Sequence, residues 1–263
     1  MDYSLLLSDE EYQKKFKNGH KTPYTYEIAR KGQSIFYFGA EHSRDPGITQ
    51  WKELERYWNQ FLKSTLENRI VLLEGPERPP LRDLTQEEVI KQFGEVGLMM
   101  LFANKEGVQI SWPDFSMQQE AEQLAKQFDA DLVTYFIFAR SAGAWLRLDT
   151  GETFEAVINK AMINTARRIG RAPHSIEFYA NIHRQVFSRD LSASEKETLM
   201  RAAAPIYHDS VINEIARTST RLRNEHIASE IEKCWQDGKS VFAVFGSSHA
   251  VIQEKALKSL LES

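Results

Sequence analysis

The chain has 263 residues and a formal net charge of −4 at pH 7, with acidic and basic residues interspersed. The lack of a basic stripe argues against a nucleic-acid partner, because phosphate binding needs clustered Lys and Arg. No apolar run approaches the length that spans a bilayer, and the N-terminus lacks the pattern of a secretory signal. A lone cysteine, Cys234, excludes an intrachain disulfide and fits a reducing compartment. We therefore expect a cytoplasmic protein with no nucleic-acid or membrane partner.

Short apolar runs alternate with helical patterns, which favours an α/β fold with a mostly parallel sheet. Residues 24–28 and 34–38 flank Lys31-Gly32, so we expect an antiparallel hairpin there. Further strands are expected over residues 68–74, 108–112, 132–138 and 241–245. The spacing of Trp51, Leu54, Trp58 and Phe61 predicts a helix, and capping boxes at Thr85-x-x-Glu88 and Ser116-x-x-Gln119 predict two more.

From Glu152 to Gln236 the pattern is helical, with breaks near Gly170, Pro173, Asp190 and Pro205. No linker or low-complexity tract interrupts the chain. We therefore predict that residues 1–263 form a single α/β domain, with helices flanking the sheet and a helical insertion at about 152–236 before the last strand.

Polar residues follow the predicted strands at the point where each one ends. The tetrapeptides Gly39–His42 and Gly246–His249 both have the form Gly-x-x-His, and Glu74-Gly75 follows another strand. Glycine lets the backbone turn sharply or approach a ligand closely, and the histidine is then carried back over the strand end. In open α/β sheets, ligands bind beyond the carboxyl ends of the strands. Each histidine alone is typical of a capping group, but together with Glu74 they predict a site.

Three side chains of this kind supply a general base, an acid and up to three metal ligands. We expect hydrolysis of an ester or amide bond in a small-molecule or peptide substrate. In one version His42 and Glu74 activate water, and His249 or Arg223 steadies the oxyanion. In the other, His42, Glu74 and His249 hold one divalent ion (zinc, manganese or cobalt) with one coordination position open.

Two other hydrolase patterns are not supported by the residues. A nucleophile elbow needs Gly-x-Ser-x-Gly, but with Gly246 as its first residue the fifth position of the motif is Ala250, and no histidine follows His249. The zinc-protease motif His-Glu-x-x-His does not occur. The charged segment Arg221–His226 reads most simply as a helix face, although Arg223 or Asn224 could offer donors to an oxyanion.

Taken together, the motifs resemble the TraB/Tiki superfamily, which includes erythromycin esterase-like and ChaN-like proteins. The matching residues are Gly39-x-x-His42, Glu74, Gly94-Glu95, Arg223-Asn224 and Gly246-x-x-His249, within residues 24–250. Most of the helical insertion matches nothing specific. The resemblance implies a hydrolase, since members include macrolide esterases and metal-dependent peptidases. It also implies that His42, Glu74 and His249 are catalytic or metal-binding, with Glu95 and Arg223 as supporting charged groups.

Two alternatives to an enzyme remain open at this point. A non-catalytic protein could bind a small ligand or haem-like group in the same pocket, with His42 and His249 as ligands. A scaffold could instead bind another protein through an exposed apolar face of the helical insertion. Residues such as Phe154, Val157 and Met162 are more simply core contacts at helical spacing.

Overall fold

The computed structural model describes residues 1–30, 32–65, 68–148 and 151–261. Its contacts group the chain into two compact units, Met1–Asp114 with Asn224–Ser263, and Phe115–Arg223. The first is an α/β unit and the second is helical. The single domain expected over residues 1–263 stays a prediction.

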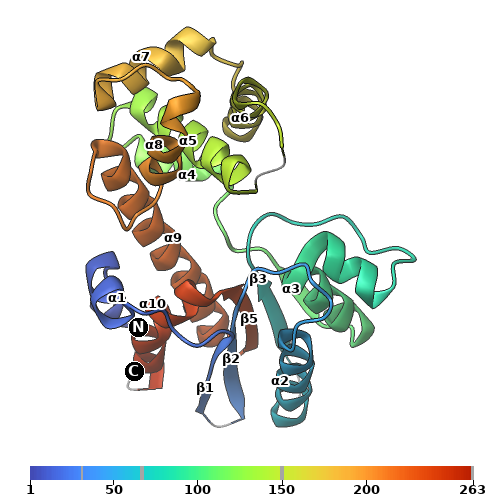
Figure 1. Ribbon diagram of the computed structural model, residues 1–263. Coiled ribbons are helices and arrows are strands. Elements are labelled where there is room, and N and C mark those ends of the chain that lie inside the picture. Colours follow the sequence, from blue (N-terminus) through green and yellow to red (C-terminus); the bar gives the residue numbers. More distant parts are fainter. Residues whose placement is uncertain (31, 66–67, 149–150, 262–263) are drawn as a thin grey trace. The chain divides into compact units, whose positions relative to one another are not determined.

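The sheet lies in the α/β unit (Figure 1). Its strands are β1 (Tyr24–Arg30), β2 (Gln33–Ala40), β3 (Arg69–Leu73), β4 (Gln109–Ser111) and β5 (Ser240–Gly246). Over the described ranges these five strands run in the order β1-β2-β5-β3-β4. Only β1 pairs antiparallel, in the predicted hairpin with β2, whose turn residue Lys31 lies outside the described residues. The predicted α/β class with a mostly parallel sheet is confirmed.

Helices cover both faces of this sheet. On one face, Phe36 and Phe38 of β2 pack in a core with α2 (Gln50–Ser64) and α3 (Gln86–Lys105). On the other, Ile35 and Tyr37 pack with α10 (Ser247–Lys258) and the C-terminal half of α9 (Val211–Gln236). The strands therefore alternate between two apolar faces, and their ends are where polar groups can gather. A short helix α1 (Asp9–Lys15) and 3₁₀ turns at Tyr3–Leu5 and Ser259–Leu261 complete the unit.

The helical unit has its own apolar core, separate from the two cores of the sheet. Its elements are α4 (Met117–Leu124), α5 (Ala130–Leu148), α6 (Phe154–Ile169), α7 (Ile176–Phe187), a 3₁₀ turn (Ala193–Glu195), α8 (Lys196–Ala202) and the first half of α9. Phe154 lies in this core and Met162 packs against it, in line with the simpler sequence interpretation of these residues. The predicted break at Gly170 is confirmed, since this glycine ends α6 in the left-handed conformation.

The strand expected over residues 132–138 was wrong, because this segment lies inside α5. Seven consecutive apolar or Thr side chains give neither helical nor alternating periodicity, so a short run of this kind does not separate a buried strand from a buried helix. Here α5 packs against α4, α6, α7 and α8, and every residue from Val133 to Ala139 is buried. The Asp129 side chain accepts from the Asp131 and Leu132 amides and starts the helix. The helical region therefore begins before Glu152.

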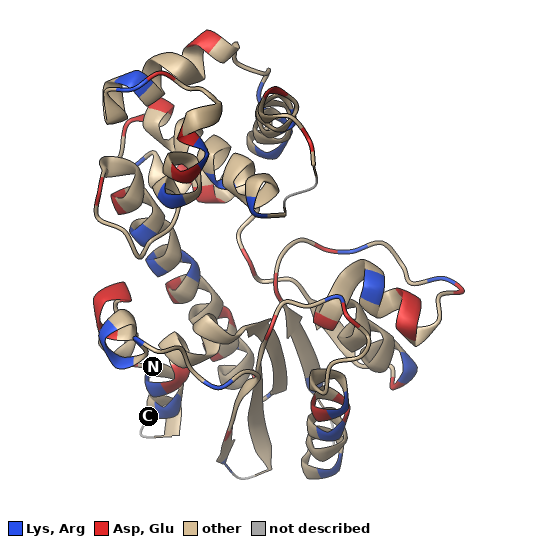
Figure 2. Ribbon diagram, in the orientation of Figure 1, with Lys and Arg blue, Asp and Glu red and all other residues tan. Residues whose placement is uncertain are grey.

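Acidic and basic residues are interspersed along the helices of each unit, as they are along the sequence (Figure 2). None of the described helices combines the length and apolar character needed to cross a membrane.

Candidate functional site

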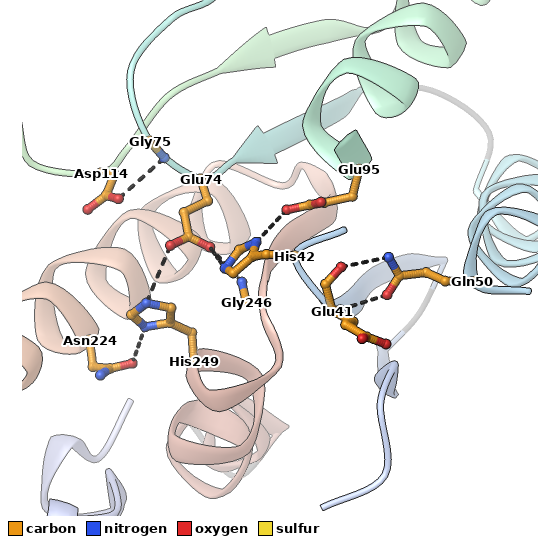
Figure 3. A network of polar contacts seen from close by, with 10 residues as sticks. All are labelled: Glu41, His42, Gln50, Glu74, Gly75, Glu95, Asp114, Asn224, Gly246 and His249. Carbon is orange, nitrogen blue, oxygen red and sulfur yellow. Dashed lines mark hydrogen bonds and ion pairs between the residues drawn. The ribbon is translucent and has the colours of Figure 1, made fainter. Parts of the chain in front are cut away.

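Both Gly-x-x-His turns emerge at the same edge of the sheet. β2 and β5 are parallel neighbours, and Ala40 lies opposite Gly246 in the register. His42 follows β2 directly, and His249 lies in the first turn of α10, directly after β5. Adjacent parallel strands that end in register carry whatever follows them to one place. The two motifs, far apart in the sequence, are therefore neighbours in space (Figure 3).

Glu74 lies between the two histidines. It follows β3, on the other side of β5, and its amide donates to Val244 O at 3.1 Å, continuing the ladder. Its Oε2 accepts from the Gly246 amide at 2.6 Å and lies 3.7 Å from His42 Nε2. Its Oε1 lies 3.7 Å from His249 Nε2. The structure thus brings His42, Glu74 and His249 together, as Figure 3 shows.

The second nitrogen of His42 is bound by Glu95, the supporting residue that the family resemblance implied. His42 Nδ1 lies 2.6 Å from Glu95 Oε1. The Glu95 side chain is 7% exposed and that of His42 is 62% exposed, so a buried carboxylate holds a solvent-accessible ring. Because a carboxylate only accepts, Nδ1 carries the proton and Nε2 faces Glu74. This arrangement orients the ring and stabilises a positive charge on it.

Gly94 explains how α3 delivers Glu95 to this place. Its backbone has φ 60° and ψ −142°, which interrupts the helical conformation within α3. This region is essentially restricted to glycine. A Cβ at this position would also lie 2.8 Å from Ser43 O, in the segment that follows His42. Glycine therefore permits both the kink before Glu95 and the close passage of the His42 loop.

Gly246 lies directly under the His42 ring. A Cβ on this residue would be 2.7 Å from His42 Nε2 and 3.5 Å from Glu74 Oε2. Its φ of −54° is open to any residue, so the requirement for glycine at this position is purely steric. The first residue of one Gly-x-x-His motif thus makes room for the last residue of the other.

The loop that carries His42 is also held in place by a buried glutamine, Gln50. Gln50, at the start of α2, is 3% exposed. Its Oε1 accepts from the Glu41 amide at 2.6 Å, and its Nε2 donates to Glu41 O at 2.8 Å. Through these two hydrogen bonds, Gln50 fixes the backbone of Glu41, the residue before His42 (Figure 3). Sequence reasoning missed it, because a glutamine at a helix start carries no motif.

A second residue missed from the sequence is Arg78, in the proline-rich loop after β3. Its Nε is buried and has no hydrogen-bond partner among the described residues. Its Nη2 would lie 3.5 Å from a Cβ on Gly75, the residue after Glu74. The Gly75 amide itself donates to Asp114 Oδ2 at 3.3 Å, so the Asp114 side chain also reaches this edge. A partly buried guanidinium with an unsatisfied nitrogen is suited to an anionic group.

Three other polar candidates have different positions. Arg140 comes just after the segment 132–138 that was expected as a strand, but it lies in α5 and pairs with buried Glu120 at 2.7 Å in the helical unit. Arg223 is the last residue of that unit, directly before Asn224 on α9, and its expected role stays a prediction. Burial raises the pKa of the Cys234 thiol, which packs against the apolar core and is not suited to act as a nucleophile.

Within the described ranges, no group of three or more His, Cys, Asp or Glu side chains has a metal-binding arrangement. Comparisons of the chain with protein-family models, with characterised proteins and with solved structures gave no match.

Proposed function

We propose that the chain is a hydrolase of the TraB/Tiki and erythromycin esterase-like type, which cleaves an ester or amide bond by general-base catalysis. One observation carries the proposal. His42 has its Nδ1 bound to a buried carboxylate at 2.6 Å and its Nε2 directed at Glu74, beside His249. An imidazole whose far nitrogen is held by a carboxylate is the usual proton acceptor in hydrolysis.

In the proposed reaction, His42 and Glu74 together activate a water molecule, whose proton passes to His42 Nε2. The water oxygen attacks the carbonyl carbon, and the carbonyl π electrons move to its oxygen, forming a tetrahedral oxyanion. When this intermediate collapses, the bond to the leaving alkoxide or amine breaks, and His42 returns the proton to it. Glu95 stabilises the imidazolium that exists between these two steps. Candidate donors for the developing negative charge are Arg78 and the backbone amides at the start of α10, from which no N-cap side chain accepts a hydrogen bond.

A metal-assisted version of the same reaction has one observation in its favour. Two ligands on one tetrahedral zinc ion lie about 3.4 Å apart, given bonds of about 2.0–2.1 Å. The two His–Glu74 separations, both 3.7 Å, are close to that spacing. His42 and His249 would then bind the ion through Nε2 and Glu74 through a carboxylate oxygen. The ion would supply a water of lowered pKa.

Turnover on a panel of esters and peptides tests the proposal. Replacing His42 with Ala or Glu74 with Gln should lower kcat by at least ~100-fold, the usual contribution of general acid–base catalysis. The exposed His208, in the helical unit, is the matched control, and His208→Ala should leave kcat unchanged. Chelator treatment and elemental analysis of the same preparations separate the two mechanisms. Full activity with far less than one metal ion per chain supports the metal-free version.

Two outcomes of this experiment contradict the proposal. Unaltered turnover in both variants would place the chemistry elsewhere. If neither variant changes turnover but both weaken binding of a small ligand or haem-like group, the pocket serves a binding protein.

A further inference from the structure

A buried hydrogen-bond network of polar side chains contacts Nδ1 of His249. Tyr37 Oη donates to Gln253 Oε1 at 3.1 Å, and Gln253 Nε2 donates to Asn224 Oδ1 at 2.8 Å. The same Asn224 oxygen lies 2.9 Å from His249 Nδ1. The residues come from β2, α10 and α9, and Tyr37, Gln253 and Asn224 are all at most 2% exposed.

Each hydrogen bond in this network has a defined donor and acceptor. The Tyr37 hydroxyl gives its hydrogen to the oxygen of Gln253, so the NH₂ group of that amide faces Asn224 and donates to it. The Asn224 carbonyl oxygen has two lone pairs and no hydrogen, so it accepts from both neighbours. His249 Nδ1 must therefore be the donor. In the neutral ring this leaves the lone pair on Nε2, the nitrogen that faces Glu74 at 3.7 Å.

We propose that Asn224 is a positioning residue that holds His249 in the Nδ1–H tautomer and directs its Nε2 lone pair into the site. This rests on the proposed function for its catalytic consequence. Asn224 was considered from the sequence only as a donor to an oxyanion, whereas here its oxygen is turned to His249 (Figure 3). Groups that fix the tautomer of a working imidazole typically change activity 10–100-fold when they are removed.

The two histidines of the site are thereby given different roles. Glu95 presents a full negative charge to Nδ1 of His42, whereas Asn224 presents only an amide dipole to Nδ1 of His249. A carboxylate stabilises the imidazolium formed by proton transfer much more than an amide does. His42 is accordingly the proton acceptor, and His249 acts through a neutral Nε2 toward Glu74 or a bound group.

Long-range ¹⁵N–¹H NMR of the imidazole rings tests this directly, because the shifts of Nδ1 and Nε2 identify the tautomer without any substrate. In the unmodified chain, neutral His249 should show a protonated Nδ1 and an unprotonated Nε2. Asn224→Leu removes the acceptor and should shift the population toward Nε2–H, with kcat lowered by about 10–100-fold. Asn224→Asp keeps an acceptor oxygen and should retain the Nδ1–H tautomer.

Asn213→Ala is the matched control for a simple loss of stability. Asn213 is as buried as Asn224, but it donates to the Arg201, Ala202 and Ala204 carbonyls in the helical unit. This variant should be less stable and leave the His249 signals unchanged. A His249 ring with Nε2–H in the unmodified chain overturns the proposal even if no variant folds, and so does Nδ1–H retained in Asn224→Leu. If the tautomer behaves as expected but no ester or peptide is cleaved, the proposed function fails and the positioning role stands.

Discussion

His42 and His249 sit at equivalent places in two copies of one motif, yet their surroundings differ. The His249 side chain is 9% exposed and is held by neutral amides, whereas His42 is open to solvent and backed by a carboxylate. An exposed base can reach water and a substrate of variable size, and a buried ring is better suited to a fixed role. The repeated motif therefore sets the position of each histidine. In the proposed reaction, the residue bound to Nδ1, Glu95 for His42 and Asn224 for His249, sets the role of the ring.

Gly246→Ala tests how tightly these residues are packed. The added Cβ would lie 2.7 Å from His42 Nε2, so the ring must move away from Glu74. We expect kcat/KM to fall at least ~10-fold, because small displacements of a reacting group are costly in rate. Gly238→Ala is the contrasting control, since Gly238 has φ +73° with nothing within 4 Å of a Cβ. It should lower stability by about 1 kcal/mol without changing kcat/KM. Unchanged kcat/KM in Gly246→Ala contradicts the steric account.

Among the secondary-structure elements, those with clear periodicity or capping boxes were predictable, and α5 was not. The boxes at Thr85 and Ser116 start α3 and α4 as expected. In α5 all residues from Val133 to Ala139 are buried, so this part of the sequence shows no polar stripe that would separate a helix from a strand. Propensity also favoured the wrong answer, since the run is rich in aromatic and β-branched residues.

The site could be predicted only as far as strand ends reveal it. His42, Glu74 and His249 each follow a strand, and adjacent parallel strands bring such residues together whatever the loops do. Gln253 gave no comparable signal, because it lies inside a helix and acts through Asn224, 29 positions away in the chain. Likewise, the pairing of Glu95 with His42 depends on the Gly94 kink, and only the family resemblance pointed to Glu95.

The helical unit contains a buried histidine, His183, whose burial should make the unit less stable at acidic pH. His183 Nδ1, on α7, lies 2.7 Å from the Tyr135 hydroxyl of α5, and its Nε2 is buried and has no hydrogen-bond partner in the described part of the chain. Burial lowers the pKa of His183 below its ordinary value of 6.5, even though Glu195 opposes this shift. Below about pH 6.5, His183 binds a proton in the unfolded chain, whereas in the folded unit it stays neutral until the pH is lower. Stability is therefore fully present above about pH 6.5 and is lost as the pH falls toward the folded-state pKa.

Urea unfolding at several pH values measures this effect. One proton taken up on unfolding lowers the free energy of unfolding by at most about 1.4 kcal/mol per pH unit. Between about pH 6.5 and pH 5, His183→Gln should flatten this dependence, and exposed His208→Gln should not. Glu195 has a lowered pKa, chiefly from its hydrogen bond to Thr198, so its contribution is lost only at more acidic pH. An equally steep dependence in His183→Gln would contradict the assignment.

At the scale of the whole molecule, the candidate site lies in the α/β unit, and the rest of the chain forms a separate helical unit. All residues drawn in Figure 3 belong to the α/β unit, although they come from strands, helices and loops spread over both its segments. The residues Phe115–Arg223 form a helical unit with an independent core. The long segment before the last strand therefore does not interrupt the pairing of β5 with β2 and β3, on which the site depends.

The central claim is that His42 and His249 work as one site around Glu74, and a double-mutant cycle tests it most directly. The measurement is kcat/KM of His42→Ala, His249→Ala and the double variant on the best substrate of the panel, with folding checked by circular dichroism. Residues that act as a unit are strongly non-additive, so the double variant should lose about as much as the worse single variant. A double variant whose loss equals the product of the two single losses would show two independent histidines and contradict the account.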